Sequence, residues 1–321
     1  NYDVKFRIVY KVGNPQPTLL TPQKEVAMSY DSMWLDQLES YDVVSNNGIT
    51  ITSEIEYDNQ GNPILITNFL YDGLNRNHAA LVWEGRKLVE IKIYNSSDDS
   101  ILRAKICYTY NDSGIRLSKT IDDMQYNAKD KRIVYGVSND ILISEEVYSR
   151  NGSNWVEDYQ IGYIYDYDGT LIGFKYYDVT GMTNYLYIKN ILGDIAKITK
   201  EDGTVVVEYF YDGYGNIVKT EGTLKNTIGT YNSFRYRSYK YDNEIGMYYL
   251  NSRYYNPEIG RFISSDGLLG EMGNINSTNM YAYCGNNPVM YSDITGYLPT
   301  FIVTAIVGVF IGAITGGVNA Y

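Results

Sequence analysis

Short runs of alternating apolar and polar residues make up most of the chain. Tyr-x-Tyr pairs recur at positions 108/110, 163/165, 185/187, 209/211, 239/241 and 281/283. A period of two places both rings of a pair on one face of a strand, where they can pack against neighbouring strands. The run from Val205 to Tyr211 adds β-branched and aromatic residues of high strand propensity. Helical periodicity is nearly absent before residue 298, so we predict an all-β structure for the first ~290 residues.

A turn motif separates these runs. Tyr57-Asp58-x-x-Gly61-Asn62 recurs as Tyr211-Asp212-x-x-Gly215-Asn216, and looser copies begin at Tyr71, Tyr110, Tyr165, Tyr177 and Tyr241. Aspartate at the first position and glycine at the fourth are typical of a type I turn followed by a bulge. The motif therefore predicts a meander of hairpins. Its irregular spacing favours a coiling sheet or solenoid over a propeller.

The C-terminal segment differs from the rest. From Phe301 to Val318 the chain holds 18 residues without a charge, just long enough for a membrane span. Gly308, Gly312 and Gly316 are spaced so that helices can approach closely. We expect a short apolar helix here. It could insert in a target membrane, act as a permanent anchor or be stored inside the β structure, and storage followed by membrane insertion is favoured.

Tyrosine is the unusual feature of the composition, with 36 residues against 8 Phe and 3 Trp in a chain of 321. We expect these rings to form the core and the cross-strand ladders of the sheet. The alternative is an exposed aromatic face that binds carbohydrate. The formal net charge of −11 argues against sequence-independent nucleic-acid binding, which needs Lys and Arg to neutralise phosphates.

Few side chains offer catalytic or metal-binding chemistry. Cys107, Cys284 and the single histidine, His78, cannot build a disulfide framework or an ordinary structural zinc site. We expect His78 to be a surface or turn residue rather than a catalyst. Phosphate-binding glycine motifs are also lacking, so we expect no cofactor and no metal. The chain opens on Asn1 without a visible signal peptide, and it could be an internal piece of a longer protein.

Two stretches resemble a known family. Residues 185–216 look like tyrosine-aspartate (YD) repeats. Residues 241–266, YDNEIGMYYLNSRYYNPEIGRFISSD, resemble the Rhs repeat-associated core, and the likeness continues from Asn279 to Tyr297. The chain thus resembles the C-terminal part of an Rhs-type polymorphic toxin of bacteria, in which YD repeats wind into a cocoon around a variable toxin.

The resemblance implies an organisation and a function. Residues 1–235 would form a YD-repeat β-shell, 236–297 the core that plugs it, and 298–321 an apolar lead into a toxin domain beyond this sequence. At 321 residues we expect an open piece rather than a closed cocoon. The function implied is an encapsulating scaffold of a toxin used against competing bacteria or a host. It would be secreted or on the cell surface and delivered to target cells, with membrane contact through residues 301–318.

The same resemblance implies the partners, which are the chain's own toxin domain, an N-terminal portion of the shell and an immunity protein. No nucleic-acid partner is expected. The alternative function is a cell-surface adhesin or carbohydrate-binding β-repeat protein.

The family resemblance also implies a single self-cleavage between Tyr297 and Leu298, after the sequence Asp293-Ile-Thr-Gly-Tyr297. In the family this chemistry resembles that of an aspartic protease, in which two close carboxylates share a proton and activate water. By position, Asp266 would be one carboxylate and Arg253 the arginine that orients them.

One aspartate expected from the family is missing. It follows the arginine directly in some members, where this chain has Tyr254, and is common at the position of Asn256. Ile294 and Gly267 also stand where proline is usual. Asp293 could replace the missing group if the core folds back far enough.

The competing interpretation assigns these residues no catalytic role. Asp266 and Asp293 would then cap turns, with Arg253 and Arg261 as their ion-pair partners.

Overall fold

The structure, a computed structural model, describes residues 4–8, 24–45, 48–72, 75–95, 98–126, 129–267, 279–293, 296 and 300–301. Its main element is one antiparallel meander of 17 strands, each paired with the next along the chain. These strands are β1 (Val4–Ile8), β2 (Lys24–Tyr30), β3 (Leu38–Ser45), β4 (Thr50–Tyr57), β5 (Pro63–Tyr71), β6 (Asn75–Glu84), β7 (Lys87–Asn95), β8 (Asp98–Tyr110), β9 (Arg116–Asp123), β10 (Lys131–Ser138), β11 (Ile141–Asn151), β12 (Asn154–Tyr165), β13 (Leu171–Asp178), β14 (Gly181–Lys189), β15 (Ile195–Lys200), β16 (Val205–Tyr211) and β17 (Ile217–Glu221).

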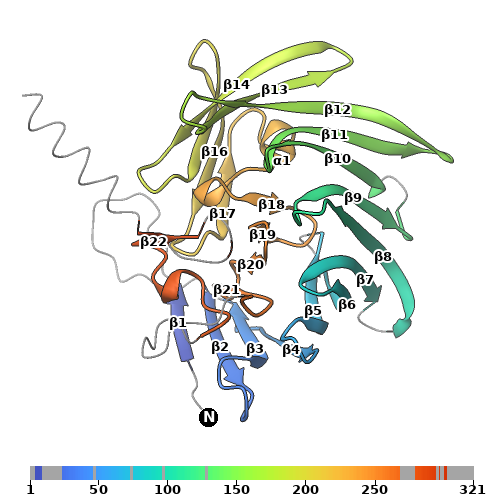
Figure 1. The fold of residues 1–321 in the computed structure, drawn as a ribbon, viewed down its shortest axis with the longest axis vertical. Coiled ribbons are helices and arrows are strands. Elements are labelled where there is room, and N and C mark those ends of the chain that lie inside the picture. Colours follow the sequence, from blue (N-terminus) through green and yellow to red (C-terminus); the bar gives the residue numbers. More distant parts are fainter. Residues whose placement is uncertain are drawn as a thin grey trace, which may run out of the picture.

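The meander curls around a smaller antiparallel sheet (Figure 1). This inner sheet comprises β18 (Lys240–Asp242), β19 (Met247–Tyr249), β20 (Tyr254–Asn256) and β21 (Arg261–Phe262), and the one-turn helix α1 (Ile228–Tyr231) leads into it. In the described chain β1 pairs with β2 and β17 with β16, and no register joins the two ends. The predictions of an all-β chain and of an open sheet are therefore confirmed.

Residues 234–266, called the inner segment below, fill the space inside the curl. Met247, Tyr249 and Tyr254 pack in one buried cluster with apolar side chains from β5 to β9. Ile259 packs in another with β2 and β3. We call the meander the wall, because its inner face is buried against this segment.

The predicted turn chemistry is present. At the β16–β17 turn, Asp212 Oδ1 accepts the N–H groups of Tyr214 and Asn216, both at 2.9 Å. Gly215 has a φ of +91° and follows a register shift at Tyr211, as expected for a type I turn with a bulge. Asp58 and Asp166 cap their own turns in the same way.

Two copies of the motif depart from this prediction. Asp178 and Gly181 are direct strand partners, so a tighter two-residue turn joins β13 to β14. Asp242 does not cap its turn like Asp212, because its carboxylate is fully buried and paired with two cations.

Those cations come from the wall strand β9. Arg116 holds Asp242 in a bidentate pair, with nitrogen–oxygen distances of 2.6 and 3.0 Å. Lys119 Nζ lies 3.0 Å from Asp242 Oδ1 and 2.6 Å from Glu244 Oε1. Burial alone would raise the pKa of Asp242, but Arg116 and Lys119 outweigh it and hold this pKa well below its usual value.

A second buried pair extends this link to β11. Lys240 Nζ lies 3.1 Å from Glu145 Oε1 and 3.2 Å from the centre of the Tyr135 ring. Burial lowers the pKa of Lys240 to about 7, although Glu145 opposes the shift. Two wall strands are thus tied to the inner segment by buried charges.

Gly215 tests the contact between a wall turn and the inner segment. A Cβ at this position would lie 2.6 Å from the Tyr236 ring, in addition to the strain of the positive φ. We expect Gly215→Ala to lower the free energy of unfolding by about 2–4 kcal/mol, measured by chemical denaturation.

The matched controls separate strain from collision. Gly203 has a φ of +84° but open space around it, so Gly203→Ala should cost about 1 kcal/mol. Gly213→Ala has neither strain nor a neighbour within 4 Å and should cost less. Equal losses at Gly203 and Gly215 would contradict the packing of Tyr236 on this turn.

Asp242 tests the charge link. Asp242→Asn leaves Arg116 and Lys119 without their main counter-ion, so we expect a loss of about 3–5 kcal/mol at pH 7. Because the folded-state pKa is lowered, the stabilisation is complete above the usual value of 3.8 and declines as the pH falls below it. The difference between wild type and variant should therefore shrink below pH 4.

The exposed turn residue Asp168 supplies the control. Asp168→Asn should change stability by less than about 0.5 kcal/mol. If both variants unfold at the same denaturant concentration, the buried pair does not hold the inner segment.

Candidate self-cleavage site

Arg253 lies at the centre of the candidate site. It directly precedes β20, and its side chain is 5% exposed. The guanidinium carbon lies 3.6 Å from the centre of the Phe262 ring, and Nη1 donates to the carbonyl of Met280 at 3.1 Å. These contacts fix the plane of the guanidinium group.

Both candidate aspartates reach one nitrogen of this group. Arg253 Nη2 lies 2.8 Å from Asp266 Oδ2 and 3.5 Å from Asp293 Oδ2. Asp266 follows β21, and Asp293 follows the short strand β22 (Tyr291–Ser292). The chain thus folds back far enough to bring together the three residues singled out from the sequence.

Gly296 is bound at the same place. Its carbonyl accepts a hydrogen bond from Arg253 Nε, and its N–H donates to Asp293 Oδ1 at 2.8 Å. The backbone at Gly296 has a φ of +77°, and a Cβ at this position would lie only 2.4 Å from Ser252 Oγ. The position therefore has no room for another side chain. Arg253 and Asp293 therefore hold the residue that directly precedes Tyr297.

The bond expected to be cut lies outside the described residues, since neither Tyr297 nor Leu298 is among them. The chain is described again at β23 (Thr300–Phe301), which pairs with β22. Phe301, the first residue of the expected apolar helix, is thus in a strand, and 302–318 lie outside the description. Across the residues that are placed, no helix is long and apolar enough to span a membrane.

The two positions that lack the family's aspartate have other roles. The Tyr254 hydroxyl accepts a hydrogen bond from Arg116 at 2.8 Å. Asn256 Oδ1 accepts the N–H of Glu258 at 2.9 Å, as a turn cap. The competing interpretation is right that Asp293 binds a turn amide, that of Gly296, and that Arg253 is an ion-pair partner of both aspartates. It is wrong for Arg261, which donates to the Tyr30 hydroxyl at 2.9 Å and to the carbonyl of Asp36.

The other residues considered in the sequence lie elsewhere. His78 is partly exposed within β6, opposite Tyr94, so it lies in a strand and not in a turn. Cys107 and Cys284 are free thiols. Burial raises the pKa of Cys284 to about 12, which disfavours a reactive thiolate. Within the described ranges no cluster of three or more His, Cys, Asp or Glu could hold a metal ion.

Sequence reasoning missed Tyr239 as part of this site. Its hydroxyl accepts the backbone N–H of Asp293 at 2.8 Å and a hydrogen bond from the Tyr283 hydroxyl at 3.1 Å. In the sequence both residues belong to Tyr-x-Tyr pairs like those elsewhere, so no signal marked them.

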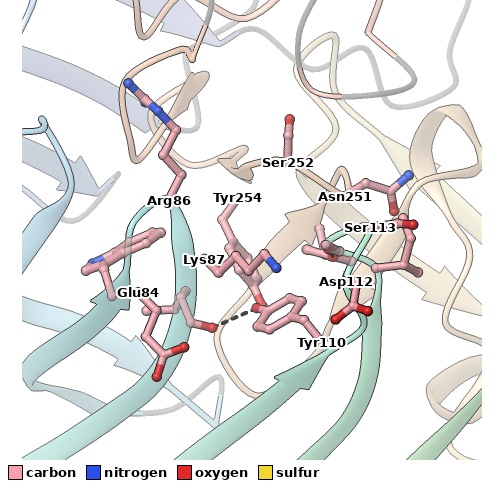
Figure 2. A pocket seen from close by; sticks show the side chains of 14 residues that line it. Glu84, Arg86, Lys87, Tyr110, Asp112, Ser113, Asn251, Ser252 and Tyr254 are labelled. Atoms are coloured by element: carbon pink, nitrogen blue, oxygen red, sulfur yellow. Dashed lines mark hydrogen bonds between the residues drawn. The ribbon is translucent and has the colours of Figure 1, made fainter.

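A cavity of about 440 Å³ is lined in part by Asn251, Ser252 and Tyr254, the chain neighbours of Arg253 (Figure 2). The turns that follow β6 and β8 line the rest of it. Its polar lining includes Glu84, Arg86 and Asp112. Space for water therefore lies beside the segment that carries Arg253.

Comparison with known proteins gives sequence relatives and a fold relative. The chain is 34% identical over 200 residues to a tRNA3(Ser)-specific nuclease WapA of Bacillus spizizenii, covering 62% of this chain and 8% of the relative. It is 39% identical over 69 residues to toxin protein Tse5 of Pseudomonas aeruginosa, covering 22% of this chain and 5% of that protein. No protein-family model matches.

The fold is shared with a much larger assembly. The crystal structure of TcdB2-TccC3-TEV matches 88% of this chain and 17% of that one, with a TM-score of 0.51 and 17% sequence identity. The chain thus spans less than a tenth of the sequence relatives and a sixth of this structural one. The sequence relatives support the resemblance to polymorphic toxins, and the structural match shows that the fold is shared.

Proposed function

We propose that this chain is part of the encapsulating shell of a secreted polymorphic toxin, used against competing bacteria or a host, and that it cleaves itself once. Residues 1–235 form the shell, 236–297 the core that plugs it, and 298–321 lead to the toxin. Its partners are that toxin domain, further shell repeats and an immunity protein. The toxin's own activity depends on a domain beyond these residues.

One observation carries the self-cleavage proposal. A single guanidinium group contacts two carboxylates and the carbonyl of the residue before Tyr297. Arg253 binds both Asp266 and Asp293, and one proton shared between the two carboxylates relieves the repulsion that two charged groups would feel. Asp293 occupies the role for which the family resemblance expected a residue at 254 or 256.

The difference in exposure suggests separate roles for the two carboxylates. The Asp266 side chain is 14% exposed and that of Asp293 1%. We assign Asp266 as the base that takes a proton from water, while the oxygen of that water attacks the carbonyl carbon of Tyr297. Asp293 gives the shared proton to the amide nitrogen of Leu298. The C–N bond then breaks and leaves a carboxylate on Tyr297 and an amine on Leu298.

The carbohydrate-binding alternative loses its support. It required a row of exposed rings, but the tyrosines line the buried clusters of the sheet. Among the described tyrosines, those classed as exposed are Tyr126, Tyr167 and Tyr177, which lie at three separate turns or strand ends. We therefore retain no second function.

The intact mass of the purified chain tests the proposal. We expect the 36.6 kDa species to convert into one that ends at Tyr297. Asp266→Asn and Asp293→Asn should each slow conversion by at least about a hundredfold, since each removes one half of the proton transfer. Asp168→Asn, at an exposed turn, should convert like the wild type.

Asn256→Asp is the diagnostic variant for the second carboxylate. Because Asn256 caps a turn, the new aspartate should not rescue Asp293→Asn. Rescue would place the second carboxylate at position 256. A wild-type chain that keeps its full mass would refute self-cleavage and leave the shell role alone.

A further inference from the structure

A strained turn lies between the wall and the candidate site. Arg237 and Ser238 have φ values of +53° and +56°, in the left-handed region that side chains other than Asn and Asp rarely adopt. Two such residues in sequence persist only where the surrounding contacts impose them.

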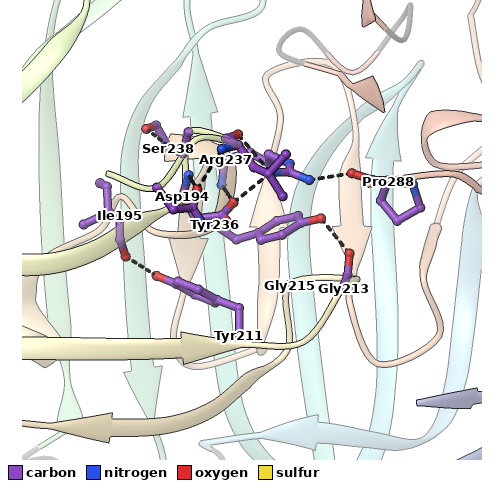
Figure 3. A network of polar contacts seen from close by, with 12 residues as sticks. Asp194, Ile195, Tyr211, Gly213, Gly215, Tyr236, Arg237, Ser238 and Pro288 are labelled. Atoms are coloured by element: carbon purple, nitrogen blue, oxygen red, sulfur yellow. Dashed lines mark hydrogen bonds and ion pairs between the residues drawn. The ribbon is translucent and has the colours of Figure 1, made fainter. Parts of the chain in front are cut away.

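The contacts come from the turn between β14 and β15 (Figure 3). Asp194 Oδ1 accepts both the backbone N–H of Arg237, at 2.9 Å, and its Nη1, at 3.2 Å. The same Nη1 donates to the carbonyl of Leu192 at 2.9 Å, and Ser238 Oγ donates to that of Gly193 at 3.0 Å. The strained turn is thus bound by the Asp194 side chain and by the backbone carbonyls of Leu192 and Gly193.

The strained turn and the residue after it also form hydrogen bonds to the segment that carries Asp293. Arg237 Nη2 donates to the carbonyl of Pro288. Tyr239, two residues further on, accepts the N–H of Asp293 and is itself bonded by Tyr283. The Arg237 and Tyr239 side chains are both at least nine-tenths buried. Hydrogen bonds therefore tie the wall hairpin to Arg237. Two residues further along the same backbone, Tyr239 binds the amide of Asp293, a proposed catalytic carboxylate.

We propose that Asp194, Arg237 and Tyr239 are positioning residues that couple self-cleavage to assembly of the wall. Asp293 is held in register with Arg253 only when the β14–β15 hairpin is docked on the inner segment. A shell whose hairpin has not yet docked leaves Asp293 out of place and the bond after Tyr297 intact. This inference rests on the proposed self-cleavage, and its test includes a readout that does not need cleavage.

Tyr239→Phe removes only the hydroxyl that binds the Asp293 amide. We expect conversion of the full-length chain to slow by about tenfold at a temperature where the variant is fully folded. Tyr211→Phe is the matched control, because its hydroxyl donates to the carbonyl of Ile195 at 3.0 Å in the same region without contacting the Asp293 segment. It should destabilise similarly and convert at the wild-type rate.

Amide hydrogen exchange gives the independent readout, in an Asp266→Asn background that keeps the chain intact. Tyr239→Phe, and also the remote Asp194→Asn, should speed exchange of the Asp293 and Gly296 amides, while Tyr211→Phe should not. Equal slowing of conversion by Tyr239→Phe and Tyr211→Phe, or unchanged Asp293 exchange in Asp194→Asn, would overturn the coupling. If the wild type never cleaves but Asp194→Asn speeds exchange of the Asp293 amide, the hairpin still positions Asp293, while the proposed protease and its coupling to wall assembly fail.

Discussion

The buried pairing of Asp242 with Arg116 and Lys119 is the interaction on which the rest of the arrangement depends. An open curl of strands cannot hide its inner face by itself, so another part of the chain must cover it. Apolar contacts supply much of that cover, but they specify no register. The buried ion pair does specify a register. Two wall cations bind the Asp242 carboxylate in a fixed geometry, and any displacement would leave charges unpaired away from water. That pairing fixes the position of Asp242, the last residue of β18, against the wall strand β9.

Tyrosine suits this architecture for a physical reason. Each ring fills core volume, and its hydroxyl can satisfy a polar group where wall meets inner segment. Tyr248 and Tyr255, for example, donate to the carbonyls of Gly215 and Tyr214 in the β16–β17 turn, at 2.8 and 2.6 Å. Phenylalanine would fill the same space and leave those carbonyls without these donors. Repeated Tyr-x-Tyr pairs thus serve two needs of a sheet whose turns bend over a packed interior.

The sequence predicts some features of the fold and the candidate site and not others. Hairpins such as Asp212–Asn216 were predictable, because turn chemistry is local and depends on residues a few positions apart. The role of Asp242 was not, since it matches the turn motif while its partners Arg116 and Lys119 are over a hundred residues away. Arg253, Asp266 and Asp293 were singled out through a family resemblance. That they meet depends on β20, β21 and β22 folding back over one another, which spacing alone does not reveal. Tyr239 was missed because its hydroxyl acts on a backbone amide and carries no sequence signal.

The central claim is that Arg253 brings two carboxylates to the chain just before Tyr297 so that they activate water there. The most direct measurement is to let the purified chain convert in water enriched in oxygen-18 and to sequence both products. The account predicts a small fragment that begins at Leu298, with one oxygen-18 atom in the new carboxylate of Tyr297. A fragment that begins elsewhere, a label found on an aspartate instead of Tyr297, or no fragment at all would contradict it.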